Sequence, residues 1–192
     1  MAEVFQLSKF KGALAHGGAR PSLFEFDVST PSSTGSTTGL ANIHFYCNVS
    51  AIPPLTVTPI ERQYFGRTVK IPGDMVFGDL NTTIINTESY VVRNKIEQWM
   101  AHINSHRGNK GSSDNTTWKV QGNLKQYSKD GGLLMTFKFN DMWPQTLSEI
   151  ALGYDTASDI EQFDVTWAYD WYEIVAGTLP TGGAPSYMTS QN

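Results

Sequence analysis

The sequence has little of what marks secreted, membrane-spanning or nucleic-acid-binding proteins. Its 192 residues include a single cysteine, Cys47, so an intramolecular disulfide is impossible and the chain suits a reducing cytoplasm. No apolar run approaches the roughly 18 residues of a transmembrane helix, so we expect no membrane insertion. Charged residues make up only 17% of the chain, the formal net charge is −4, and lysine and arginine form no run. Tight nucleic-acid binding depends mainly on phosphate neutralisation and is therefore not expected.

Catalytic and cofactor-binding motifs are also missing, since the sequence has no GxSxG, no P-loop and no glycine-rich phosphate cradle. His102 and His106 lie four residues apart, a spacing that lets two imidazoles share a metal, but no Glu follows His102. Four carboxylates lie close enough in sequence to suggest an acid–base pair: Asp155, Asp159, Glu161 and Asp164. They fall in or beside a polar turn. We interpret both groups as solvated and predict no enzyme activity, metal or cofactor.

The most regular pattern runs from Ile160 to Ile174, where apolar and polar residues alternate strictly. Because strand side chains alternate between two faces, this stretch predicts one half-buried β-strand. Its apolar parity is Phe163, Val165, Trp167, Tyr169 and Trp171, and its polar parity is Gln162, Asp164, Thr166, Ala168 and Asp170. The aromatic parity is predicted to be core rather than a ligand-stacking platform.

Further strands are predicted by the same alternation of apolar and polar residues. Their ranges are Phe24–Val28, Asn42–Ala51, Val76–Asn86, Trp118–Tyr127, Leu133–Asn140 and Leu147–Tyr154. Trp118–Tyr127 and Leu133–Asn140 are expected to form a hairpin, because an Asp-Gly turn separates them, and Trp143-Pro144 is expected to end it. The inward residues of Asn42–Ala51 would be Ile43, Phe45, Cys47 and Val49. Cys47 is therefore expected to be a buried thiol rather than a nucleophile.

One long helix is predicted at about 89–107. Its apolar stripe, with spacings of three and four, consists of Val92, Ile96, Trp99, Met100 and Ile103. Asn86 and Thr87 would supply N-cap oxygens, and Gly108 would follow the last turn. We expect a single domain over 1–192, with an N-terminal arm at 1–18 and a flexible C-terminal extension at 175–192. The fold class is mainly β, a β-sandwich or barrel with one flanking helix.

The segment Leu55–Asp74 has a different character, because neither parity is consistently apolar from Pro59 onward. A hairpin that turns near 63–66 would present mixed, partly aromatic surface on both faces. An isolated hairpin is marginally stable in water. The segment is therefore either a mobile flap or, as we favour, a surface that a neighbouring subunit completes. The residues predicted to form this contact with a neighbouring subunit are Thr58, Glu61, Arg62, Gln63, Tyr64, Phe65, Gly66, Arg67 and Thr68.

Three segments, in this order along the chain, carry a resemblance to a known family. They are ARPSLF at Ala19–Phe24, ERQYFGRTVKIPGD at Glu61–Asp74, and MWPQTLSEIALGYDTASDIEQFDVTWAYDWYE at Met142–Glu173. Together with the single helix, they resemble the tail tube proteins of contractile-tailed bacteriophages, which are related to the tube proteins of type VI secretion. The resemblance covers about Ala19 to Glu173. The chain departs from the family in a longer, Ser/Thr-rich loop at Thr30–Gly39 and in the segment after Glu173.

The resemblance implies a structural virion protein of the phage tail. Six protomers would form a ring, the sheets would join around a β-lined channel, and rings would stack into the inner tube. The implied partners are further copies of the chain, the tail sheath protein, and the baseplate and tail terminator proteins. Phage DNA would pass through the lumen without tight binding, and no cofactor is implied. Assembly would take place in the host bacterial cytoplasm.

Two alternatives remain open at this point. The first lies within the same machinery and is a baseplate tube-initiator or a type VI secretion ring protein. The second is a β-sandwich carbohydrate-binding or hydrolytic module that uses Trp167, Trp171 and the acidic turn. A binding platform needs exposed aromatic rings, so the exposure of these two tryptophans distinguishes the second alternative from a structural role.

Overall fold

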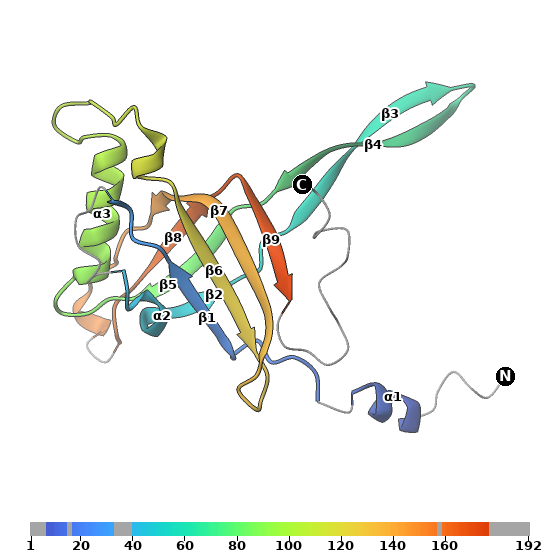
Figure 1. Cartoon of the computed structure of the whole chain (residues 1–192), viewed down its shortest axis with the longest axis horizontal. Coiled ribbons are helices and arrows are strands. Elements are labelled where there is room, and N and C mark those ends of the chain that lie inside the picture. The colour runs from blue at the N-terminus through green and yellow to red at the C-terminus, as the bar shows by residue number, and fades with distance from the viewer. Residues whose placement is uncertain (1–6, 15–16, 33–39, 157–158, 177–192) are drawn as a thin grey trace.

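The computed structural model describes residues 7–14, 17–32, 40–156 and 159–176 (Figure 1). The helices are α1 (Leu7–Ala13), α2 (Ile43–Tyr46) and α3 (Val91–Ile103), with 3-10 turns at Asn115–Thr117 and Tyr154–Thr156. The strands are β1 (Phe24–Val28), β2 (Cys47–Ser50), β3 (Leu55–Tyr64), β4 (Arg67–Phe77), β5 (Leu80–Ile85), β6 (Val120–Tyr127), β7 (Leu133–Leu147), β8 (Gln162–Ala168) and β9 (Trp171–Ala176). Most of the predicted C-terminal extension, the loop tip at 33–39 and the start of the predicted N-terminal arm lie outside the described residues.

The body of the molecule consists of two antiparallel layers that share the long strand β7. The first part of β7 pairs with β6 and β9, and its last part pairs with β8. One layer therefore runs β1-β6-β7-β9 and the other runs β7-β8-β5-β2. Strands β3 and β4 pair only with each other in a separate two-stranded sheet. This architecture confirms the predicted mainly-β class with one long helix, but the sandwich is not a closed barrel.

The core lies between the two layers and is centred on Trp167. The ring of Trp167 lies 5.8 Å from Phe26 of the opposite layer and 5.8 Å from Trp99 of α3. All three side chains are completely buried. Their polar atoms are satisfied, since the Trp167 indole N–H donates to Thr82 Oγ1 at 2.9 Å and that of Trp99 donates to the Trp118 carbonyl at 2.8 Å. Helix α3 thus closes the end of the sandwich that lies away from the β3–β4 hairpin (Figure 1).

The predicted single strand at Ile160–Ile174 is wrong, because the chain folds there into two strands of different layers. β8 ends at Ala168 and β9 starts at Trp171. Asp170 fixes the corner, since its amide donates to the Asn140 carbonyl and its carboxylate pairs with Lys119 at 2.7 Å. Because of this reversal, Trp171 no longer faces the core with Phe163, Val165 and Trp167, and its side chain is 45% exposed.

The predicted strand at Asn42–Ala51 is half helix. Residues Ile43–Tyr46 form α2, and the backbone N–H of Ile43 donates to the Leu40 carbonyl. Only Cys47–Ser50, which is β2, forms a strand. A helical turn spaces side chains differently from a strand, so Ile43 is buried whereas Phe45 is 74% exposed. Val49 is also exposed, because β2 is an edge strand with a bulge after Cys47.

Three other predicted boundaries shift for local reasons. β7 continues through Trp143-Pro144 to Leu147, because the proline sits at an irregularity opposite β8. The strand predicted at Leu147–Tyr154 does not form, apart from its first residue. The strand predicted at Val76–Asn86 is divided at Gly78-Asp79, where β4 ends and β5 begins.

Helix α3 is shorter than the predicted range 89–107. It starts after Tyr90, whose backbone is left-handed at φ 53°, and it has no side-chain cap. The expected cap residue Asn86 instead donates from its amide to the Glu161 carboxylate at 2.9 Å. The apolar stripe is confirmed, since Val92, Ile96 and Trp99 are buried. At the C-terminus, Val175 and Ala176 belong to β9, so the predicted extension begins two residues too early.

Candidate assembly surface

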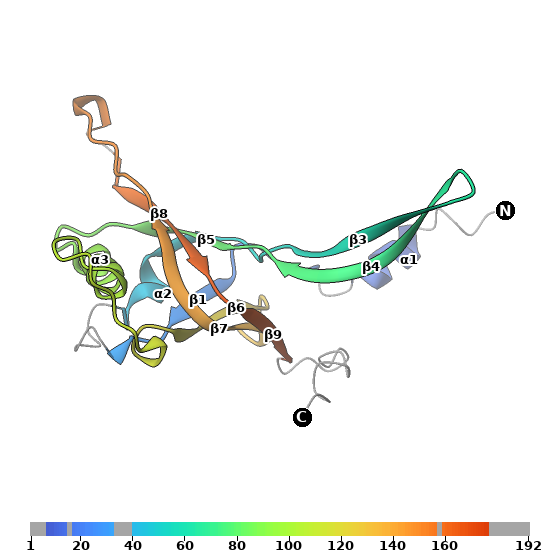
Figure 2. The same ribbon diagram turned by 90° about the horizontal axis from the view of Figure 1, so that it is seen from above.

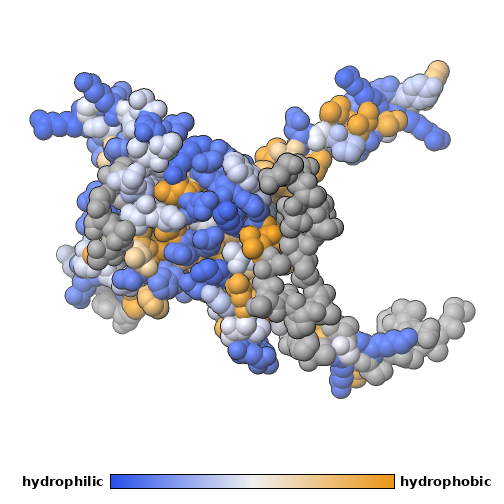
Figure 3. Space-filling view, in the orientation of Figure 1, coloured by the Kyte–Doolittle hydropathy of each residue, from blue (hydrophilic) through white to orange (hydrophobic). Residues whose placement is uncertain are grey.

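The β3–β4 hairpin extends away from the body as a long two-stranded ribbon (Figures 1 and 2). Every residue of β3 is exposed, and so is every residue of β4 except the half-buried Gly73 and Phe77. The exposed apolar side chains on it are Leu55, Val57, Ile60, Tyr64, Phe65, Val69, Ile71, Met75 and Val76. Figure 3 shows hydrophobic side chains along this ribbon, at upper right. Contiguous apolar surface of this kind is typical of a protein–protein contact.

A two-residue turn closes the hairpin at Phe65-Gly66. Both residues have positive φ, 44° and 77°, which is the type I′ arrangement that matches the twist of the flanking strands. A bulky residue such as Phe65 rarely adopts a positive φ, because its Cβ then crowds the backbone. The turn places the Phe65 ring 90% exposed at the end of the ribbon, edge-on to Tyr64 at 4.6 Å. The ribbon thus ends in an unpartnered aromatic pair.

The register explains why neither parity looked apolar in the sequence. Ile60 pairs with Ile71, Arg62 with Val69, and Tyr64 with Arg67, and paired residues share a face. The distal half of the ribbon therefore has an apolar face that also carries two arginines. The opposite face is polar, with a Glu61–Lys70 salt bridge of 3.4 Å and a Gln63–Thr68 side-chain hydrogen bond of 3.1 Å.

Near the middle of the ribbon, the register shifts and two prolines face each other. Pro59 pairs with Pro72, and the shift lies between this pair and the Val57–Met75 pair. Gly73 is required at this irregularity, because a Cβ there would lie 2.6 Å from the Thr58 carbonyl oxygen. Apolar side chains lie on both sides of the shift, so the exposed apolar surface follows the whole ribbon.

The base of the hairpin is fixed to the body. Gly78 donates from its amide to the Pro54 carbonyl at 2.9 Å, and its own carbonyl accepts a hydrogen bond from the Tyr169 hydroxyl. The Phe77 ring packs on Tyr172 at 5.4 Å and on Tyr169 at 6.3 Å. These contacts hold the base of the hairpin on the body. The rest of the ribbon is not buried against the body.

All nine residues predicted for the interface lie on this exposed ribbon, from Thr58 to Thr68. The structure brings Arg62, Tyr64 and Arg67 to one face and Glu61, Gln63 and Thr68 to the other. Their role in contacts between subunits stays a prediction. Sequence reasoning missed Ile60, Val69 and Ile71, although a two-residue turn at 65–66 would have placed all three on one face.

The outer faces of the two layers are polar, and their polar side chains pair in different ways. On the β1-β6-β7-β9 layer, Lys125 pairs with Glu25 at 3.4 Å and Lys138 pairs with Glu173 at 3.8 Å. On the other layer the contacts are mainly between uncharged groups, such as Thr166 to Asn81 at 2.9 Å. A hydrogen bond from the Tyr127 hydroxyl lowers the pKa of Glu25, and the same bond raises the pKa of Tyr127 to about 12.

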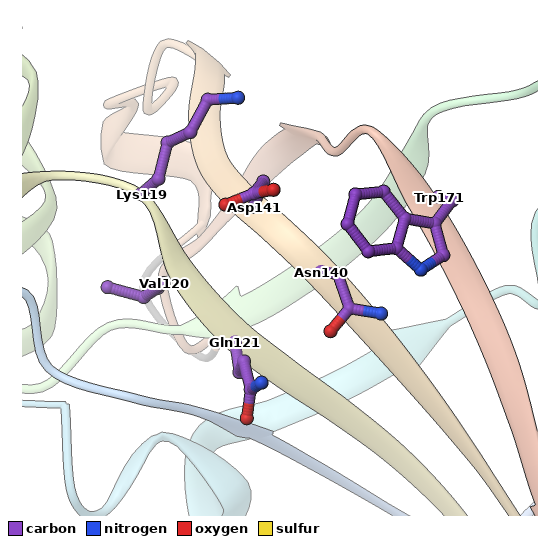
Figure 4. A pocket seen from close by; sticks show the side chains of 6 residues that line it. All are labelled: Lys119, Val120, Gln121, Asn140, Asp141 and Trp171. Atoms are coloured by element: carbon purple, nitrogen blue, oxygen red, sulfur yellow. The ribbon is translucent and has the colours of Figure 1, made fainter. Parts of the chain in front are cut away.

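A shallow pocket of about 400 Å³ opens where β6, β7 and β9 meet (Figure 4). Its lining residues are Lys119, Val120, Gln121, Asn140, Asp141 and Trp171. Two of its polar groups are already engaged, because Lys119 pairs with Asp170 and the Asn140 amide donates to Glu173 at 2.9 Å. Trp167, the other tryptophan of the carbohydrate-binding alternative, is completely buried. Trp167 and Trp171 therefore do not form a paired tryptophan platform.

The remaining candidate groups do not converge on a chemical site. His102 is half-buried with its Nε2 at 3.4 Å from Thr117 Oγ1, and His106 is exposed. Across the described residues, no three His, Cys, Asp or Glu side chains are grouped so as to hold a metal ion. Cys47 is half-buried, and burial raises the pKa of its thiol to about 12, which keeps it protonated and unreactive. Among the helices described, none is long and apolar enough to cross a membrane.

Comparison with known proteins agrees with the geometry. The phage tail tube protein family model matches residues 19–175. The tail tube protein gp19 of Enterobacteria phage T4 is 27% identical over 157 residues, which is 81% of this chain and 91% of that protein. The tail tube protein of Serratia phage KSP90 is 24% identical over 165 residues, 85% of this chain and 93% of that protein.

A solved structure shares the fold. It is the sheath/tube terminator of the extracellular contractile injection system PVC, in the extended state, with a TM-score of 0.59 and 17% identity over 83% of this chain and 97% of that chain. The family match spans both layers, α3 and the whole β3–β4 hairpin. The chain belongs to the phage tail tube protein family, and its role is structural, as a tail tube protein.

Proposed function

We propose that this chain forms hexameric rings that stack into the inner tube of a contractile phage tail, through which the genome passes. The observation that carries the proposal is the β3–β4 hairpin, whose exposed apolar surface has no partner within the described part of the chain. An unassembled ribbon of this length is marginal in water, so a neighbouring subunit has to cover it.

The interface comprises Thr58, Glu61, Arg62, Gln63, Tyr64, Phe65, Gly66, Arg67 and Thr68, together with Ile60, Val69 and Ile71. Residues 1–192 form one tail tube domain, with 1–18 as an N-terminal arm and the residues after β9 as an extension. The role involves no catalysis and no cofactor.

The polar outer faces suit a wet channel. Lysines on the β1-β6-β7-β9 face are paired with carboxylates, so the face carries no excess positive charge that would hold sliding DNA. The sheath protein, the baseplate and the tail terminator are the proposed partners, in line with the sheath and terminator named for a protein of the same fold. Assembly is proposed to occur in the host bacterial cytoplasm, and the tube becomes part of the virion.

The test replaces the aromatic pair at the end of the hairpin. Tyr64→Asp/Phe65→Asp should leave a folded protomer, since both rings are exposed, but abolish rings and tubes in negative-stain electron microscopy. Lys129→Asp, in the exposed β6–β7 turn, changes charge away from the hairpin and should leave tubes intact. Normal tubes from the hairpin variant would overturn the proposed interface.

A further inference from the structure

A second protruding segment lies at the opposite end of the molecule from the hairpin. It consists of the described residues between β7 and β8, 148–156 and 159–161, here called the β7–β8 loop. Figures 1 and 2 both place it at the α3 end of the body, whereas the hairpin points away from the other end. A single copy therefore cannot bring its own hairpin tip to its own β7–β8 loop.

The β7–β8 loop is anchored at both ends. At its start, the Arg93 guanidinium of α3 donates to the Ser148 carbonyl at 3.2 Å. At its end, the Asn86 amide N–H donates to the Glu161 carbonyl at 2.8 Å, and the Tyr90 hydroxyl donates to the Glu161 carboxylate at 2.9 Å. The Asn86 side-chain amide also donates to the Glu161 carboxylate, and this hydrogen bond, followed by the one from the Tyr90 hydroxyl, lowers the pKa of Glu161. The loop is thus held on the body while its middle projects.

The projecting part is apolar and acidic. Leu152 is 79% exposed, Tyr154 is fully exposed and Ile160 is 67% exposed. They lie on or beside a groove of about 550 Å³ lined by Ala151, Leu152, Gly153, Tyr154, Asp159 and Glu161. The loop sequence contains four acidic residues and no lysine, arginine or histidine. No basic side chain of the described chain lies within salt-bridge distance of Asp155 or Asp159.

The hairpin tip has the complementary character. Its exposed aromatic pair, Tyr64 and Phe65, is flanked by Arg62 and Arg67 on the apolar face. Glu61 is on the other face and is paired with Lys70, so it does not neutralise the arginines. Arg62 and Arg67 themselves have no carboxylate within salt-bridge distance in the part of the chain that the structure describes. Opposite charges around matching apolar surfaces favour correct pairing and speed up encounter.

We propose that the hairpin tip of one copy docks on the β7–β8 loop of the next copy. Tyr64 and Phe65 contact Leu152 and Tyr154, and Arg62 and Arg67 face Asp155 and Asp159. The contact joins two different surfaces of identical chains, which is the head-to-tail kind that generates rings and stacks. This inference rests on the proposed function and names the surface that receives the hairpin.

Charge exchange in the 192-residue chain tests the pairing. Arg62→Glu/Arg67→Glu and Asp155→Lys/Asp159→Lys each place like charges at the contact, so each should raise the critical concentration for tube formation at least tenfold. All four substitutions in one chain restore opposite charges and should restore tubes. Glu88→Lys/Asp130→Lys is the matched control, since it changes net charge equally at exposed acidic residues outside the loop. Tube yield is measured by sedimentation and electron microscopy.

The outcomes separate the two proposals. If the hairpin variant assembles normally, both the proposed interface and the docking site are wrong. If the hairpin variant fails but the loop variant assembles normally, or if the fourfold variant is not restored, the hairpin interface stands and the docking site is wrong. Thermal unfolding measured for each variant identifies any that fails because it does not fold.

A cysteine cross-link tests the position directly and does not depend on charge. Tyr64→Cys/Leu152→Cys in one chain should give a ladder of disulfide-linked oligomers on non-reducing gels of assembled protein. Either single variant should give at most dimers. Cys47 does not compete, because its half-buried thiol stays protonated. A ladder supports the docking site, and its absence in assembled tubes overturns it.

Discussion

The sandwich body and the β3–β4 hairpin are built from similar strands, but the body buries its apolar side chains and the hairpin exposes them. In β5 and β8, buried and exposed residues alternate, so each strand places one face in the core. In β3 every residue is exposed, although the strand carries Leu55, Val57 and Ile60. In the body, the apolar residues of each alternating strand are buried against other parts of the same chain. In the hairpin the same residue types have no intramolecular partner among the described residues, which is why we propose the hairpin as the assembly surface.

The largest expected effect comes from breaking the body at its centre. Trp167→Ala removes the ring that contacts Phe26 and Trp99, and large-to-small changes of this kind cost about 3–5 kcal/mol. The matched variant Trp171→Ala removes a 45% exposed ring and should cost less than about 1 kcal/mol. Urea denaturation followed by circular dichroism measures both. Equal losses from the two variants would contradict the assignment of Trp167 alone to the core.

A smaller effect is expected at the joint between the two regions. In Gly78→Ala the new Cβ would lie 2.7 Å from Pro54 Cγ, so the base of the hairpin must shift. Overpacking of this kind costs about 1–3 kcal/mol. The shift also redirects the ribbon, so tube formation should fail even where the body remains folded. Gly131→Asn is the control, because Gly131 has no atom within 4 Å of the added Cβ and Asn tolerates its positive φ.

A pH-dependent term of about 1 kcal/mol or less is expected from the Tyr127–Glu25 hydrogen bond, because both groups are partly exposed. The bond lowers the folded-state pKa of Glu25, so its stabilisation is complete above the ordinary carboxyl pKa and is lost as the pH falls through the folded-state value. Tyr127→Phe should therefore be less stable than the natural chain at pH 7, and the difference should shrink in acid. Denaturation midpoints at pH 7 and pH 3 measure this, and a constant difference would contradict it.

The smallest effect on stability is expected on the hairpin itself. Ile71→Ser removes an apolar side chain that is 48% exposed, so the protomer should lose no more than about 0.5 kcal/mol. Assembly should nevertheless weaken severalfold, measured as the critical concentration for tubes. The comparison between body and hairpin would fail if Ile71→Ser destabilised the protomer as much as Trp167→Ala.

Much of the fold could be predicted from the sequence because local patterns and tertiary packing agree. The Val92, Ile96 and Trp99 stripe, the β6–β7 hairpin and the buried Phe163-to-Trp167 parity follow directly from periodicity. The errors occur where tertiary contacts override local pattern. The reversal at Asp170 depends on Lys119 and on the Asn140 carbonyl, which are distant in sequence.

The candidate surface likewise has one feature that the sequence predicts and one that it does not. The position of the exposed hairpin was predictable, since a stretch with no consistent apolar parity between two well-patterned regions stands out. Its faces were not, because the positive-φ turn at Phe65 and the register shift beside Pro59 decide which side chains share a side. The carboxylates of the β7–β8 loop indicate only a solvated turn in the sequence. Its exposed Leu152, Tyr154 and Ile160 become visible only in three dimensions.

The opposed prolines Pro59 and Pro72 have a consequence for the protomer before it assembles. Both strands of a two-stranded ribbon are edges, and exposed edges recruit other strands into aggregates. The paired prolines lack N–H groups that would point outward at the middle of each edge, so neither edge offers an unbroken ladder to a foreign strand. The proline pair therefore limits strand-by-strand aggregation of the unassembled protomer, even though the apolar side chains of the ribbon are exposed.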